Sequence, residues 1–242
     1  MDEGVLAENP DLIEQAIGSG NSLVVKGTIN ADDIKAIDEY IKTSNDKISL
    51  DLSGTTLTEI PYRAFEDNIR LTEVTLPTTL TTISGLAFYN CAYASFPNFS
   101  AIAPNLETIG SSAFNHCYVL GDSYEFNALK SIGSSAFAYT NLREVTFPST
   151  ITEIPEGLFR NCDNIHDVTF LGDVKSIGGY VFSGTVQLQT IDLSNCESVP
   201  TCAEDAFSHM RTTTQIKVKS SLLSAFQAAD VWKDIASQIV GQ

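Results

Sequence analysis

Apolar and polar residues follow one pattern that repeats along most of the chain. In six successive segments an Ile lies five residues before a Phe: Ile60/Phe65, Ile83/Phe88, Ile109/Phe114, Ile132/Phe137, Ile154/Phe159 and Ile177/Phe182. A seventh, looser copy runs from Val199 to Phe207 with a three-residue insertion. Successive Phe residues are 23, 26, 23, 22, 23 and 25 positions apart. A self-similar period of this length is typical of repeat architectures.

A second pattern, in which apolar and polar residues alternate, follows most of these Phe residues. It covers 71–76, 142–147, 165–170 and 188–193 and returns at Ile216 and Val218. β-Branched residues at period two predict short strands. We therefore predict a right-handed solenoid in which equivalent strands stack in parallel, with the Phe residues in one column on the convex side and Ile and Leu in the interior. Between Phe88 and Leu129 the run FPNFSAIAPN replaces the alternation, and the pattern assigns no register.

The two ends of the chain carry helical patterns. Segments 9–17 and 30–44 predict amphipathic helices, with a short strand at 23–25 between them and Asn30 as the N-cap of the second. Segment 220–239 predicts a closing helix in which Trp232 packs over the open end of the stack. We expect a single domain over 1–242: an N-terminal cap (1–47), the repeats (48–219) and a C-terminal capping helix (220–242).

The repeats resemble the BspA-like leucine-rich repeats, whose consensus is L-x-x-I-x-x-x-A-F-x-x-C-x-x-L-x-x-I-x-L-P. The Ala-Phe pair matches at Phe65, Phe114, Phe137 and Phe207, and the Asn-Cys pair at Cys91 and Cys162, with His116-Cys117 as a variant. The resemblance covers about residues 48–219. It implies an α/β leucine-rich repeat solenoid of about seven repeats with short parallel strands and helical caps. It also implies a bacterial protein that is secreted or attached to the cell surface and takes part in adhesion.

The charge of the chain excludes some partners. The sequence has 30 Asp and Glu against 14 Lys and Arg, a formal net charge of −16. Because phosphates must be neutralised by basic side chains, we expect no nucleic-acid partner. No apolar run reaches the about 20 residues of a membrane-spanning helix, and no signal-peptide pattern follows Met1. With the resemblance, we expect an exported monomer whose signal peptide has been removed.

Catalytic and cofactor motifs are missing from the sequence. The Gly-rich nucleotide loops, HExxH and GxSxG do not occur. His116 and His209 are four repeats apart, about 19 Å along a stack of strands, so they do not share a metal ion. Five cysteines match no zinc pattern. Cys91, Cys117 and Cys162 share one repeat position and are expected as buried thiols, while a bond between Cys196 and Cys202 stays open. We expect neither an enzyme nor a cofactor.

The outward positions of the predicted strands form the candidate partner-binding face. They are Asp51, Glu73, Thr75, Glu144, Thr146, Asp167, Thr169, Thr190, Asp192, Gln215 and Lys217. Glu144 and Asp167 should be neighbours on adjacent strands, where like charges repel unless a cation or basic side chain relieves them. A solvated face is one interpretation, with Arg143 and His166 giving that relief. A calcium site at this pair, or a seat for a basic partner, is the other.

A rigid face assembled before its partner arrives favours binding, because little conformational entropy is then lost. We therefore expect a non-enzymatic binding or adhesion module for an extracellular protein or glycan. The alternatives are a structural spacer without a ligand of its own and a calcium-dependent adhesin.

Overall fold

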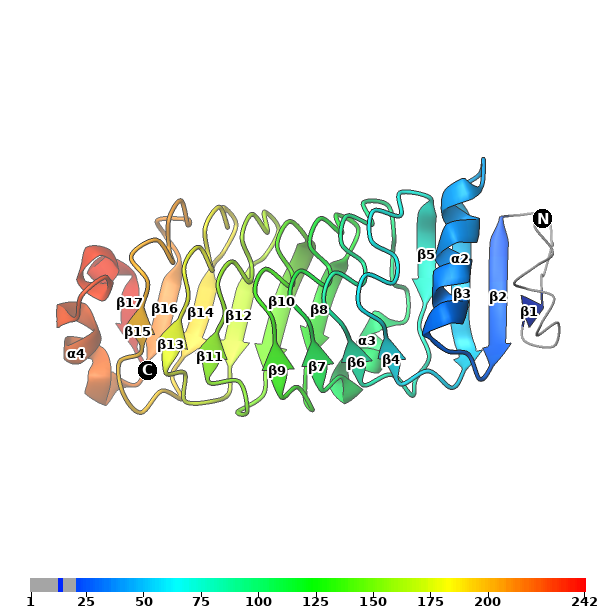
Figure 1. The fold of residues 1–242 in the computed structure, drawn as a ribbon. Helices are drawn as coiled ribbons and strands as arrows, with labels where there is room; N and C mark the ends of the chain where they lie inside the picture. The colour runs from blue at the N-terminus through cyan, green and yellow to red at the C-terminus, as the bar shows by residue number, and fades with distance from the viewer. Residues whose placement is uncertain (1–12, 15–20) are drawn as a thin grey trace.

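The computed structural model describes residues 13–14 and 21–242, which form an elongated stack of similar turns with α2 near one end and α4 at the other (Figure 1). Most turns contribute one longer strand, one two-residue strand and a turn segment that carries the repeat Phe. The longer strands form two sheets. The first sheet contains the short β1 (Ile13–Glu14), β2 (Ser22–Gly27), β3 (Ile48–Thr55) and β5 (Leu71–Thr75). The second sheet contains β8 (Gly121–Glu125), β10 (Asn141–Phe147), β12 (Asp167–Phe170), β14 (Thr190–Leu193), β16 (Gln215–Val218) and β17 (Ile239–Gly241).

Strand register places like residues over one another, as the alternating pattern predicts. Val145 of β10 pairs with Val168 of β12, which pairs with Ile191 of β14 and then with Ile216 of β16. All four are buried. The strand pairs in both sheets are parallel except β1 with β2, which is antiparallel. The predicted parallel stacking of equivalent strands is thus confirmed.

The repeat Ile residues lie in a second ladder that the sequence analysis did not predict. Each occupies a two-residue parallel strand: β4 (Glu59–Ile60), β6 (Thr82–Ile83), β7 (Thr108–Ile109) and β9 (Ser131–Ile132), then β11 (Glu153–Ile154), β13 (Ser176–Ile177) and β15 (Thr201–Cys202). In β15, Cys202 pairs with Ile177 and takes the place of the Ile. The seventh copy therefore keeps the five-residue spacing to Phe207, and the three-residue insertion expected in it is wrong: residues 199–207 are as many as in the other copies.

The seven repeat Phe side chains form one continuous stack. Centroids of successive rings are 5.4 to 6.4 Å apart from Phe65 to Phe207. Their planes differ by at most 23°. The first six rings are fully buried and Phe207 is half-buried. The predicted aromatic column is confirmed.

The turn segment around each Phe is hydrogen-bonded to the next turn. Backbone N–H groups two residues before, at and two residues after the Phe donate to carbonyls one turn ahead, as in Phe65 N to Ala87 O at 2.8 Å and Asp67 N to Tyr89 O at 2.8 Å. Left-handed residues make this geometry possible, with φ of 53° to 77° at the positions two before and two after the Phe. Gly184, with φ 77°, is one of them. Asn and Gly tolerate this conformation best, which explains the Asn of the Asn-Cys pair.

The irregular run between Phe88 and Leu106 interrupts the sheet of longer strands. Ser95 makes an isolated bridge to Glu73, and α3 (Phe99–Ile102) and the 3-10 helix η1 (Ala103–Asn105) follow in place of a strand. The Asn98 side chain replaces the missing backbone partner, because its Nδ2 donates to Leu76 O at 2.6 Å and its Oδ1 accepts from Leu76 N at 3.1 Å. The sheet resumes at β8.

Helix α2 (Ala31–Thr43) confirms the helix expected over 30–44. Asn30 caps it by accepting from the backbone N–H groups of Asp32 and Asp33. Asp38, buried on its inner side, accepts from Asn68 Nδ2 at 2.8 Å and pairs with Lys42 at 2.8 Å. Burial raises the pKa of Asp38. The side chain of Asn68 thus connects α2 with the first repeat.

Two predictions for the ends are wrong. Ile13 and Glu14, inside the helix expected over 9–17, form β1 and pair with β2; residues 9–12 and 15–17 lie outside the described residues. The single helix expected over 220–239 is divided into η2 (Ser220–Leu222), α4 (Leu223–Ala228) and η3 (Trp232–Gln238), followed by β17. Val231, with φ 67°, turns the chain between α4 and η3. This turn allows Trp232 to pack on Phe207 at the end of the Phe stack. β17 then pairs with β16 and extends the second sheet.

Candidate binding surface

The outward side chains of the longer strands form two rows along the second sheet, which we call the strand face. Register aligns Ser123, Glu144, Asp167, Thr190 and Gln215 in one row. It aligns Glu125, Thr146, Thr169, Asp192 and Lys217 in the other. Asp51, Glu73 and Thr75 hold the same positions on β3 and β5, on the far side of α3. The structure thus brings together eight of the eleven predicted residues and separates three.

Sequence reasoning missed Ser123 and Glu125 because it assigned no strand register between Phe88 and Leu129. The alternation of buried Tyr124 and Phe126 with exposed neighbours is the signal that could have located β8. Both missed residues are exposed.

Two of the predicted acids, one on each sheet, also bond to the backbone. Asp51 Oδ1 accepts from Ser53 N at 2.8 Å, and Asp192 Oδ1 accepts from Ser194 N at 2.9 Å. The Asp192 bond lies at the end of β14, whereas the Asp51 bond lies inside β3. Glu73, Glu125 and Glu144 are exposed and make no such bond within the described part of the chain, so these carboxylates are open to a partner.

Glu144 and Asp167 are Cα partners on β10 and β12, as expected. Neither has an ion-pair partner within residues 21–242, and His166 instead shares a hydrogen bond with Gln187 at 3.2 Å. Neither Arg143 nor His166 therefore relieves the repulsion between the two carboxylates by an ion pair. The described residues contain no group of three or more His, Cys, Asp or Glu side chains that could hold a metal ion. Calcium takes six to eight oxygen ligands, so a site at this pair stays a prediction.

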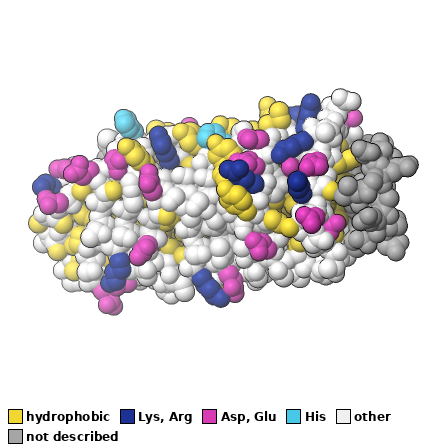
Figure 2. All heavy atoms as spheres, viewed as in Figure 1, with side chains coloured by type: hydrophobic (Ala, Val, Ile, Leu, Met, Phe, Trp, Pro, Cys, Tyr) yellow, Lys and Arg dark blue, Asp and Glu magenta, His cyan; other side chains and the backbone are white. Residues whose placement is uncertain are grey.

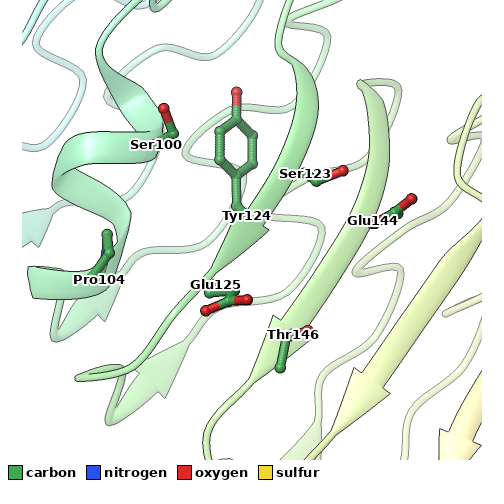
Figure 3. A pocket seen from close by; sticks show the side chains of 7 residues that line it. All are labelled: Ser100, Pro104, Ser123, Tyr124, Glu125, Glu144 and Thr146. Atoms are coloured by element: carbon green, nitrogen blue, oxygen red, sulfur yellow. The ribbon is translucent and has the colours of Figure 1, made fainter.

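A hollow of about 280 Å³ opens on the strand face where the sheet resumes (Figure 3). Ser100 of α3 and Pro104 of η1 form one wall, and side chains of β8 and β10 form the other (Figure 3). The lining residues are Ser100, Pro104, Ser123, Tyr124, Glu125, Glu144 and Thr146. The set has two carboxylates and four hydroxyl groups and no basic side chain. It accepts hydrogen bonds and attracts cationic groups.

Within the described residues, six ion pairs form, all away from the strand face. Figure 2 shows acidic and basic side chains close together on the side that carries the two-residue strands. Arg63 pairs with Glu66 at 3.3 Å and Lys130 with Glu107 at 2.8 Å. Among the described residues, no ion pair includes an acid of the strand face. Exposed acids without an ion pair also occur on other surfaces of the described chain, such as Glu153, Glu156 and Asp163.

The cysteines are packing residues. All five thiols are free. Sγ of Cys91 donates to Phe65 O at 2.9 Å, and Sγ of Cys162 donates to Phe137 O at 2.9 Å. Burial raises the pKa of Cys162 to about 11 and that of Cys202 to about 12. These thiols stay protonated near neutral pH and are poor nucleophiles.

His116 and Trp232 also have structural partners. His116 stacks on Tyr139 with ring centroids 4.1 Å apart, and partial burial lowers its pKa. Trp232 is buried, donates from Nε1 to Pro200 O at 3.1 Å and packs on Phe207 with centroids 5.2 Å apart. It therefore closes the Phe stack, as expected. The longest described helix, α2, has 13 residues, and none of those described could span a bilayer.

Comparisons with known proteins agree with this architecture. A family model described as the BspA type leucine rich repeat region matches residues 35–166 and 152–229 in six copies. No curated protein matches the chain. Among solved structures, a leucine-rich repeat protein from Bacteroides ovatus is 23% identical with a TM-score of 0.54, and the match covers 88% of this chain and 55% of that one. This chain thus spans about half of that protein, and the likeness shows the fold alone.

A second solved structure is a leucine rich cell surface protein from Faecalibacterium prausnitzii. It is 16% identical over 93% of this chain and 96% of its own, with a TM-score of 0.35. A likeness of this size supports no further conclusion about the present chain.

Proposed function

Since this chain belongs to the BspA-type leucine-rich repeat family, we propose that it is a non-enzymatic binding module that acts outside a bacterial cell and presents its strand face to a protein or glycan. Family membership supports a role in protein interaction, and the adhesive, extracellular role is our inference from it. The whole chain, 1–242, would act as a single domain.

One observation supports the choice of surface. The strand face places four acids without an ion pair in the described chain, Glu125, Glu144, Asp167 and Asp192, in two adjacent rows of one sheet. A protein segment with Lys or Arg side chains would complement these carboxylates, and opposite charges would speed its association. The hollow beside α3 offers such a side chain Glu125 and Glu144 together with Tyr124 and Ser123.

Rigidity supports the same proposal. The strands that carry the strand face are paired with a neighbour on each side, except β8, which is an edge strand and pairs with β10 alone. The inward side chains of these strands are buried. The face is therefore assembled in the free protein, and binding costs little ordering entropy.

A binding screen with the intact chain on extracellular-matrix proteins and on a glycan array tests the proposal. A triple variant, Glu125→Gln, Glu144→Gln and Asp167→Asn, should lower the affinity for a basic partner at least about tenfold. A matched triple variant of exposed acids on other surfaces, Glu153→Gln, Glu156→Gln and Asp163→Asn, has the same charge and should keep the affinity. If no protein or glycan binds, the chain is a structural spacer and the proposal is wrong.

A further inference from the structure

A second hollow lies at the start of the longer strands and shares no lining residue with the first. It encloses about 240 Å³ and is lined by Asn141, Arg143, Asn164, His166 and Gln187. We call it the amide hollow. No carboxylate lines it, although the chain carries 30 acidic residues against 14 basic ones. The hollow is thus a cationic and amide-rich place on a strongly acidic protein.

The three amides form a ladder across three turns. Asn164 Nδ2 donates to Asn141 Oδ1 at 3.0 Å, and Gln187 Nε2 donates to Asn164 Oδ1 at 3.2 Å. Gln187 Oε1 lies 3.2 Å from His166 Nε2. Each contact occupies an amide oxygen, and each amide nitrogen has two N–H groups. Spare donors therefore outnumber spare acceptors, and the hollow suits a ligand rich in oxygen acceptors.

A β-bulge brings Arg143 to this hollow. The register between β8 and β10 shifts between Leu142 and Glu144, so Arg143 is the extra residue and both Arg143 and Glu144 are exposed. Bulges commonly redirect a side chain in this way. The guanidinium of Arg143 has no ion pair or hydrogen bond within the described part of the chain. Its planar fork of donors fits a carboxylate in a bidentate manner.

From this arrangement we propose that the amide hollow binds a sugar that carries one carboxylate, of the uronic or sialic acid class. The carboxylate would pair with Arg143, and the spare N–H groups of Asn141, Asn164 and Gln187 would donate to the ring oxygen and hydroxyls. This inference rests on the proposed binding function and gives it a second site with its own ligand class.

Two observations favour a sugar over an acidic peptide. Tyr118 does not line the hollow, but it is 46% exposed and lies three residues before Gly121, the partner of Asn141, so a pyranose that extends past Asn141 would meet an aromatic side chain of the preceding turn. The net charge of −16 repels a partner with several acids far more than it repels a single carboxylate.

Calorimetric titration of the full chain with two pairs of matched probes tests the inference: methyl glucuronide against methyl glucoside, and sialyllactose against lactose. At least one acidic sugar should bind at least about tenfold tighter than its neutral counterpart. Arg143→Ala should lose at least about tenfold in affinity for it. Arg160→Ala removes an exposed arginine whose guanidinium lies 5.2 Å from the Tyr180 ring, outside the hollow, and should leave affinity unchanged.

Three outcomes would overturn the inference: equal binding of acidic and neutral sugars, an unchanged affinity in Arg143→Ala at an unchanged melting temperature, or Arg143-dependent binding of a poly-glutamate peptide without sugar binding. Partner binding that depends on Glu125 and Glu144 but not on Arg143 would leave the proposed function intact while removing this second site. A chain that binds nothing would remove both.

Discussion

At the residue scale, the fold depends on side chains that meet copies of themselves one turn away. Phe137 is fully buried, and its ring lies 5.9 Å from that of Phe114 and 6.4 Å from that of Phe159. The Phe137→Ala variant should lose about 3–5 kcal/mol in the free energy of unfolding, because a cavity opens in the middle of the stack. Urea denaturation measures this. Phe207→Ala, at the half-buried end, should lose less; a loss below about 1 kcal/mol for Phe137 would contradict its burial.

Backbone conformation at single residues is equally specific. Gly184 has φ 77°, and a Cβ there would lie 2.2 Å from Asn161 Oδ1 one turn before. Gly184→Ala should therefore cost about 1–3 kcal/mol. Part of this cost comes from the clash, so the same substitution in an Asn161→Gly background should cost less. Equal costs in the two backgrounds, measured as a double-mutant cycle, would assign the whole effect to the backbone.

At the scale of elements, a single side chain takes the place of a strand at the edge of the first sheet. Asn98 satisfies both backbone groups of Leu76 at the edge of the first sheet. Asn98→Ala leaves a buried donor and acceptor unpaired and should cost about 1–3 kcal/mol. Asn98→Asp keeps an acceptor for Leu76 N and loses the donor for Leu76 O. A chemical denaturation curve that is unchanged in the Ala variant would show that Asn98 does not replace a strand.

The docking of α2 should depend on pH. Burial raises the pKa of Asp38 above its value in the unfolded chain, so the folded state favours the protonated form. The contribution of Asp38 to stability is therefore complete below the unfolded pKa of about 4 and is lost as pH rises through the higher folded pKa. Relative to Asp38→Asn, the wild type should lose free energy of unfolding as the pH rises above about 4. An increase over this range would mean that Lys42 and Asn68 outweigh burial.

At the scale of the whole molecule, charge opposes the compact state. A net charge of −16 makes the chain repel itself. Adding NaCl up to about 0.5 M should raise the melting temperature by screening this repulsion, and CaCl2 of equal ionic strength should raise it equally. Glu144→Gln should be neutral or slightly stabilising. A further rise with calcium that Glu144→Gln abolishes would instead establish the calcium site at Glu144 and Asp167.

Much of the architecture follows from patterns that are local in the sequence. The Ile–Phe spacing and the alternating runs identify which side chains face inward, and Val145, Val168, Ile191 and Ile216 stack in the expected register. The sequence does not identify Cys202 as the residue at the Ile position of β15, because cysteine is not β-branched and does not by itself indicate a strand. The row of candidate residues on β10 to β16 was likewise predictable, since outward positions follow directly once the inward ones are known.

What the sequence alone determined is the repeating stack, because periodic burial of apolar residues leaves one economical way to pair equivalent segments. Only the tertiary structure decided where the stack is interrupted, how the chain turns after α4, and which charges stay unpaired. These depend on residues about one turn or more apart in sequence, such as Asn98 with Leu76 and Gln187 with Asn164. A local pattern carries no information about such contacts, and the two hollows proposed as binding sites are made of them.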